Sequence, residues 1–159
     1  HAVFAGDGPL RPRLQARLGR YGHFLGHVAQ TGVAAMLRRA QLFVFPSQIE
    51  HWPNAVAEAK ACGAPVLVAP CGGGRLVETD GADGIIVDGT LPAWMEAAQA
   101  LLSDPARLCA VSKAGAAHVE RVIPSWESVL KEDLFPVWDG AWTAVSRRDA
   151  SPVGGSLNT

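Results

Sequence analysis

The chain lacks the features that mark several classes of protein. Its 159 residues carry 14 Lys and Arg against 15 Asp and Glu, so no excess of positive charge is present to hold nucleic acid or an anionic membrane by charge alone. No run approaches the roughly 18 apolar residues of a membrane-spanning helix, and the opening residues HAVFAGDGPL lack the pattern of a signal peptide. We expect no nucleic-acid partner, no transmembrane segment and a cytoplasmic location.

Cysteine is scarce, and histidine forms no cluster. The three cysteines, Cys62, Cys71 and Cys109, are widely spaced and make no CxxC pair, which predicts neither a disulfide framework nor a zinc site. We expect reduced, buried thiols. The five histidines show no spacing typical of a ligand set, so we predict no metal and no cofactor.

Apolar residues, by contrast, make up 48% of the chain, enough for the core of one globular domain. Short apolar runs bounded by turn residues alternate with longer amphipathic stretches, which is typical of an α/β protein with a parallel sheet flanked by helices. The predicted strands span 2–5, 23–26, 42–46, 65–69 and 84–87. The predicted helices span about 9–20, 31–39, 54–62, 74–80, 91–102 and 105–120.

The last part of the chain differs from this pattern. A helical stretch opens at Pro124 and is expected to break near Pro136. Its apolar residues recur at intervals of three or four and form a stripe that packs either on the chain's own sheet or on another partner surface: Trp126, Val129, Leu130, Leu134, Val137, Trp138, Ala141 and Val145. We expect a domain over 1–123, truncated at its start because His1 lies almost on a strand, then helices over 124–149 and a disordered tail over 150–159.

Two glycine-rich turns each follow a predicted strand. GDGP spans Gly6 to Pro9, and CGGGR spans Cys71 to Arg75. Glycines before a helix allow backbone amides to approach a phosphate, although a plain turn between a strand and a helix explains each of them as well. Because open α/β sheets bind ligands at the carboxyl edge of their strands, two such turns at one edge favour a shared ligand.

Two carboxylates, Glu50 and Glu58, lie in the stretch PSQIEHWPNAVAEAKACGAPV among small and apolar residues. An unpaired buried charge is costly, so a ligand outside the chain is one explanation; a solvated carboxylate favoured by the helix dipole is the other. Pro53 and Asn54 suit the start of a helix, which leaves Glu50 in a loop and Glu58 one turn inside. There Glu58 would serve as a double acceptor for sugar hydroxyls, and Lys60 is expected on the adjacent solvent side.

The same stretch, written PS-x-x-E-x-W-P-N-x-x-x-E-A-x-A-x-G-x-P-V, resembles the strand, loop and helix of the retaining GT-B glycosyltransferases of family 4, whose signature is two glutamates separated by seven residues. GDGP, FLGHV, the glycine run with Glu78 and SW near the end extend the resemblance over about residues 2–130. It implies a Rossmann-like domain, the C-terminal half of a GT-B fold lacking its first strand. That strand normally lies between those at 2–5 and 42–46.

The resemblance also implies roles for individual residues. Glu50 would be the catalytic residue facing the hydroxyls of the transferred sugar, and Glu58 would bind the ribose of the donor. Pro53 stands with Trp52 where the family usually has Phe-Gly, and because proline has no N–H, a contact from this turn must come from Asn54 or Ala55. The implied substrate-binding residues are Glu58, Gly6, Gly8, His27, Val28, Trp52, Asn54, Ala55, Gly72, Gly73 and Gly74.

The implied reaction is the metal-independent transfer of a sugar with retention at the anomeric carbon. The partners would be a UDP-, GDP- or ADP-sugar donor and a sugar or lipid acceptor held by an absent N-terminal domain, in the cytoplasm or at a membrane's cytoplasmic face. The family's Arg and Lys that neutralise the leaving diphosphate lie upstream of GDGP, so this fragment alone is expected to be inactive. Two alternatives stay open: a binding-only, degenerate GT-B module and a UDP-sugar epimerase.

Overall fold

The computed structural model describes residues 1–139, so the predicted tail, and Ala141 and Val145 of the apolar stripe, lie outside the described residues. The chain divides into two compact units at the bond between Glu120 and Arg121. The first unit carries all the strands of the described chain and the loops that follow them. A ligand site at the ends of the strands therefore belongs to the first unit.

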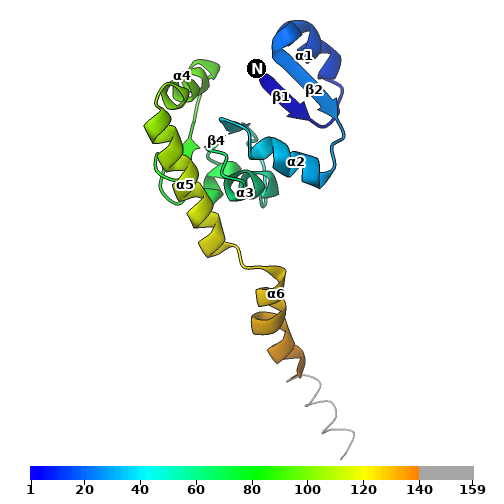
Figure 1. Ribbon diagram of the computed structural model, residues 1–159, viewed down its shortest axis with the longest axis vertical. Coiled ribbons are helices and arrows are strands. Elements are labelled where there is room, and N and C mark those ends of the chain that lie inside the picture. The colour runs from blue at the N-terminus through cyan, green and yellow to red at the C-terminus, as the bar shows by residue number, and fades with distance from the viewer. Residues whose placement is uncertain (140–159) are drawn as a thin grey trace, which may run out of the picture. The chain divides into compact units, whose positions relative to one another are not determined.

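Strands and helices alternate through the first unit, as Figure 1 shows, which confirms the predicted α/β class. The strands are β1 (Ala2–Ala5), β2 (Gly22–Gly26), β3 (Phe43–Phe45), β4 (Val66–Val68) and β5 (Ile85–Ile86). The helices are α1 (Arg11–Leu18), α2 (Gln30–Leu37), α3 (Asn54–Ala61), α4 (Leu91–Leu102) and α5 (Pro105–Val122), with short 3₁₀ turns η1 (Gly19–Tyr21) and η2 (Gly73–Leu76).

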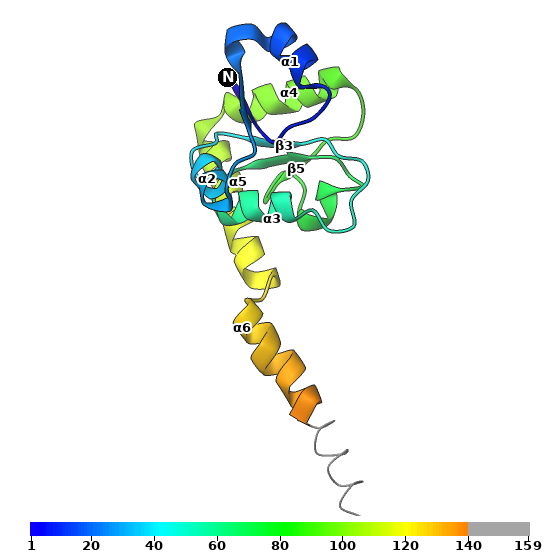
Figure 2. The same ribbon diagram turned by 90° about the vertical axis from the view of Figure 1, so that its right-hand side faces the viewer.

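The strands form two separate parallel sheets. β1 pairs with β2, and β4 lies between β3 and β5. Within residues 1–139 no strand joins β3 to the β1–β2 pair, and Val44 on β3 is about half exposed. Figure 2 shows α3 on one face of the three-stranded sheet and α4 on the other. This arrangement buries β4 completely, as its run of Val, Leu and Val favours.

The core is centred on β4 and on the helices that pack around it. The almost fully buried apolar residues lie between positions 53 and 111, and the largest of them are Pro53, Val56, Val66, Leu67, Val68, Leu76, Leu101 and Val111. The β1–β2 pair has a smaller apolar contact, in which the rings of Phe4 and Phe24 stack with centroids 4.6 Å apart. The three-stranded sheet is therefore the stable platform of the unit.

The prediction of a helix over residues 74–80 is wrong. Only the 3₁₀ turn η2 forms, and the backbone from Val77 onward turns away because the carboxylate of Asp83 accepts hydrogen bonds from the amides of Glu78, at 3.1 Å, and Thr79, at 2.8 Å. A local side-chain acceptor has replaced the helical bonds of that segment.

The same carboxylate forms a buried ion pair that corrects the expectation for Lys60. Lys60 is 1% exposed, and its Nζ lies 2.7 Å from Oδ2 of Asp83 and also donates to the carbonyl of Leu76. His118 of α5 brings Nδ1 to 3.1 Å from the same Oδ2 without forming a hydrogen bond. Lys60 therefore joins α3 to the segment behind η2 rather than facing solvent.

The second unit, in its described part, is helical. α6 (Trp126–Ser128) leads into a π-helical stretch, η3 (Val129–Leu134), and helical residues continue from 135 to 139. The break expected near Pro136 is wrong, because helical residues continue through it to 139. Only the π-helical stretch one turn earlier departs from α-helical geometry, since the missing N–H of Pro136 removes the bond that would close that turn. Val137 and Trp138 are 66% and 54% exposed. Among residues 1–139 no helix has the length and hydropathy needed to cross a bilayer.

The ion pair between Lys60 and Asp83 should make the free energy of unfolding depend on pH. Burial raises the pKa of Asp83, but the hydrogen bonds from Lys60, Thr79 and Glu78 and the charge of Lys60 outweigh it, so the pKa lies below the usual value of 3.8. A lowered pKa in the folded state stabilises the protein above the unfolded pKa, and this contribution is lost as the pH falls below about 4. Asp83→Asn should cost about 3 kcal/mol at pH 7.

The measurement is denaturant unfolding of wild type and Asp83→Asn between pH 7 and pH 2. The difference in the free energy of unfolding between the two proteins should narrow below pH 4, whereas Asp88→Asn, a change at an exposed carboxylate, should differ little from wild type throughout. A difference that stayed constant across this range would contradict the role given to the ion pair.

Candidate functional site

Glu50 lies in the loop between β3 and α3, and the structure holds its side chain in place. The hydroxyl of Ser47 donates to Oε1 of Glu50 over 3.0 Å. The loop borders a cavity of about 390 Å³. Its lining residues come from this loop and from the segment after β4: Gln48, Ile49, Glu50, His51, Cys71 and Arg75.

The glycine turn after β4 packs directly against that loop. A Cβ on Gly72 would lie 2.6 Å from the carbonyl oxygen of Ser47 and 3.2 Å from Cγ of Glu50, and one on Gly73 would lie 2.5 Å from Cβ of Val68. Gly74 follows at the start of η2, where its amide donates to the carbonyl of Ala69 over 3.0 Å. Gly72 and Gly73 are therefore required by the packing of the chain itself, and their contact with a donor stays a prediction.

Glu58 is exposed on α3 and meets a different neighbour. Oε1 of Glu58 lies 3.5 Å from Nε2 of Gln30, the first residue of α2. His27 and Val28 precede Gln30 in the loop after β2. The structure thus brings Glu58 beside the loop that carries these two predicted residues, although the cavity at Glu50 does not include it.

Gly6 and Gly8 lie in the turn after β1, beside the end of β2. The amide of Gly6 donates to the carbonyl of Gly26 over 2.6 Å. Asp7 in the same turn forms an ion pair with Arg11 at 2.9 Å, and Arg11 also donates to the carbonyl of Phe24 over 3.2 Å. This turn is therefore tied to β2, immediately before His27.

The start of α3 leaves one amide available. Pro53 is buried, and Trp52 is exposed. The amide of Asn54 donates to the carbonyl of Trp52 over 3.0 Å, and the amides of Val56 and Ala57 donate to Pro53. Within the described chain no acceptor is recorded for the amide of Ala55, so Ala55 rather than Asn54 is the amide that a ligand could use.

Three residues that the sequence reasoning did not assign to the site lie in it: Gln30, Ser47 and Arg75. Ser47 and Arg75 belong to the quoted motifs, and their position in the sequence, after strands, was the signal that could have found them. No local signal in the sequence could have assigned Gln30 to the site, because its position there depends on how α2 packs on α3. The expectation of buried thiols is wrong for Cys71 and Cys109, which are exposed; all three cysteines are free.

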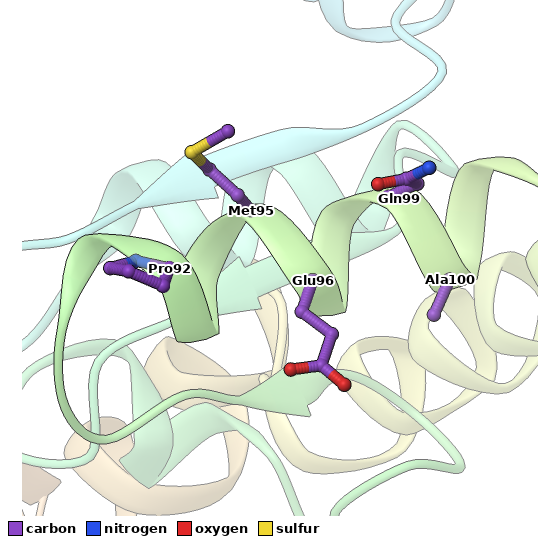
Figure 3. A pocket seen from close by; sticks show the side chains of 5 residues that line it. All are labelled: Pro92, Met95, Glu96, Gln99 and Ala100. Carbon is purple, nitrogen blue, oxygen red and sulfur yellow. The ribbon is translucent and has the colours of Figure 1, made fainter.

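A larger hollow, of about 570 Å³, lies elsewhere on the first unit. Figure 3 shows its five lining side chains along the single helix α4: Pro92, Met95, Glu96, Gln99 and Ala100. They supply one carboxylate and one amide but no cation, and none of them follows a strand. The hollow at Glu50 therefore fits a polar ligand better, although it is smaller. No set of His, Cys, Asp or Glu in residues 1–139 is arranged to hold a metal ion.

The sequence and the fold of the chain are similar to those of known proteins of one family. The model of the glycosyl transferases group 1 matches residues 1–104. A D-inositol 3-phosphate glycosyltransferase from Thermobispora bispora is 36% identical over 157 residues, which is 94% of this chain and 36% of that protein. Sucrose-phosphate synthase from Thermosynechococcus elongatus superposes with a TM-score of 0.75 at 25% identity, over 89% of this chain and 38% of its own.

A further solved structure, HepE of Anabaena in complex with UDP and glucose, superposes with a TM-score of 0.64 over 92% of this chain and 40% of its own. At 17% identity this likeness shows the fold alone. The chain spans little more than a third of the length of the curated relative from Thermobispora. On the match over residues 1–104 and the identity to that relative, the chain belongs to the glycosyl transferases group 1 family and has the fold of a GT-B C-terminal domain.

Proposed function

We propose that the chain binds the nucleoside-diphosphate-sugar donor of a retaining glycosyltransferase. In this proposal Glu50 faces the hydroxyls of the transferred sugar and Glu58 binds the ribose. The observation that carries it is the cavity in which Glu50, oriented by the hydroxyl of Ser47, lies against the glycine turn after β4. A fixed carboxylate accepts hydrogen bonds from two neighbouring hydroxyls at once, which suits a sugar ring.

The position of Glu58 supports the role in ribose binding. Its carboxylate is exposed, so it can reach a ligand, and Gln30 beside it supplies an amide that can both donate and accept. The loop before Gln30 contains His27 and Val28, which the proposal places along the base. A nucleoside at Glu58 and a sugar at Glu50 would be joined by the diphosphate near the amide of Ala55.

In the proposed reaction the bond between the anomeric carbon and the diphosphate breaks, and its electron pair goes to the leaving diphosphate. The acceptor oxygen bonds to the carbon on the same face, and its proton passes to an oxygen of the leaving diphosphate. Hydrogen-bond donors fixed before the reaction stabilise the charge on the diphosphate without reorganising, so the proposal needs no metal. The acceptor would be bound by a further domain, and the chain alone would transfer nothing.

HepE, whose structure contains UDP and glucose, supports the choice of a UDP-sugar as the first donor to test. The binding-only alternative predicts the same binding but no transfer by the complete protein. The epimerase alternative requires a histidine and a carboxylate as acid and base, and His51 and Glu50 do line one cavity. Incubation of the complete protein with UDP-glucose and a panel of sugar and lipid acceptors, followed by analysis of the sugar product, separates the three: a glycoside, unchanged donor, or the epimer.

The role of Glu58 makes a direct prediction. Glu58→Ala should weaken UDP binding by about 1–3 kcal/mol, because ribose hydroxyls lose their acceptor, and should weaken 2′-deoxy-UDP binding less. Isothermal titration calorimetry of both ligands measures this difference. The control is Glu96→Ala, which removes an exposed carboxylate from the hollow of α4. The nearer Lys60 is unsuitable as a control because it is buried. Equal UDP affinities in wild type and Glu58→Ala would remove the assignment.

The role of Glu50 is tested by comparing two ligands that differ only in the sugar. Glu50→Gln should leave the affinity for UDP unchanged and lower the affinity for UDP-glucose by about 1–2 kcal/mol, since an amide accepts fewer hydrogen bonds than a carboxylate. Competition of both ligands against a fluorescent UDP analogue gives the ratio of the two affinities. A variant that lost UDP and UDP-glucose binding equally would show that Glu50 acts on the fold of the loop and not on the sugar.

A further inference from the structure

Arg75 is an exposed arginine in the lining of the cavity at Glu50. A guanidinium keeps its charge under all ordinary conditions and offers five N–H donors in a fixed fork. Within residues 1–139 the side chain of Arg75 forms no hydrogen bond and no ion pair, and it does not pair with Glu50 although both line the same cavity. The cavity therefore holds a cation and a carboxylate that do not neutralise each other.

The backbone around Arg75 is held firmly. Leu76, the next residue, is 1% exposed in the core, and its carbonyl accepts from Lys60. On the other side, Gly73 packs against Val68 too closely to admit a Cβ. Because the chain is fixed two residues before Arg75 and immediately after it, Arg75 extends toward the cavity from a rigid position and not from a free loop.

The other cations next to the predicted binding residues already have partners. Arg11, beside Gly6 and Gly8, is paired with Asp7 and bonded to the carbonyl of Phe24. Lys60, on the helix of Glu58, is buried against Asp83. Arg75 thus differs from both in having its charge available for a ligand.

We propose that Arg75 binds the diphosphate of the donor and stabilises the charge that gathers on it when the glycosyl bond breaks. This inference rests on the proposed function and extends it by naming a phosphate-binding residue within the glycine turn. The layout of charge fits such a ligand: the guanidinium takes the anionic diphosphate by a bidentate contact, while Glu50 takes the neutral, hydroxyl-rich sugar.

The test is isothermal titration calorimetry of the full chain with UDP, uridine and inorganic pyrophosphate, for wild type, Arg75→Gln and Arg75→Lys. Arg75→Gln should weaken UDP binding about 10- to 100-fold, the loss expected for a charge-assisted hydrogen bond, and leave uridine binding unchanged. Arg75→Lys, which keeps the charge without the fork, should lose less. Arg17→Gln, an exposed arginine on α1, is the matched control, and thermal unfolding checks that each variant is folded.

The outcomes separate this inference from the proposed function. If wild type and Arg75→Gln bind UDP equally well, Arg75 does not contact the diphosphate. The same conclusion follows if the substitution lowers the affinity for uridine as much as it lowers the affinity for UDP. If wild type binds pyrophosphate but neither UDP nor uridine, and Arg75→Gln abolishes pyrophosphate binding, Arg75 binds an anion but the proposed nucleotide-binding function is wrong. If wild type binds neither pyrophosphate nor UDP, both are wrong.

Discussion

The ion pair between Lys60 and Asp83 is the interaction on which the arrangement of the site depends. Lys60 lies on α3, the helix of Glu58, and Asp83 caps the backbone amides that follow η2. Through the carbonyl of Leu76, the same lysine also reaches the turn that carries Arg75. A charge pair buried to this degree is costly to break because the remaining charge has no partner, so the helix and the turn are fixed relative to each other.

Around this link the site divides into two parts. One part is the cavity of Glu50, the glycine turn and Arg75; the other is Glu58 with Gln30 and the loop after β2. The loop of Glu50 and the glycine turn follow β3 and β4, neighbouring strands of one parallel sheet, so they lie on a common side. The hydrogen bond between Gln30 and Glu58 brings the loop after β2 to the helix that follows β3. A nucleotide sugar has the corresponding two parts, a nucleoside and a sugar, with an anionic link between them.

Much of this could be predicted from the sequence, because the signals are local. The short apolar runs gave the five strands, and Pro53 with Asn54 placed the start of α3 and left Glu50 in its loop. What could not be predicted depends on contacts between distant residues. Lys60 is buried only because Asp83, 23 residues away, is folded against it, and the same carboxylate ended the helix expected over 74–80. The glycines after β4 were correctly predicted in a turn, but their tight packing against Ser47 and Val68 depends on how the loop after β3 folds over that turn.

If one ligand bridges the loop of Glu50, the glycine turn and the start of α3, its binding must slow the exchange of their backbone amides with solvent. Hydrogen–deuterium exchange of the chain with and without saturating UDP-glucose measures this. We expect slower exchange in residues 48–55 and 70–76 on binding, and in the segment 27–30 beside Glu58. Slower exchange confined to residues 91–100 of α4, around the larger hollow, would contradict it.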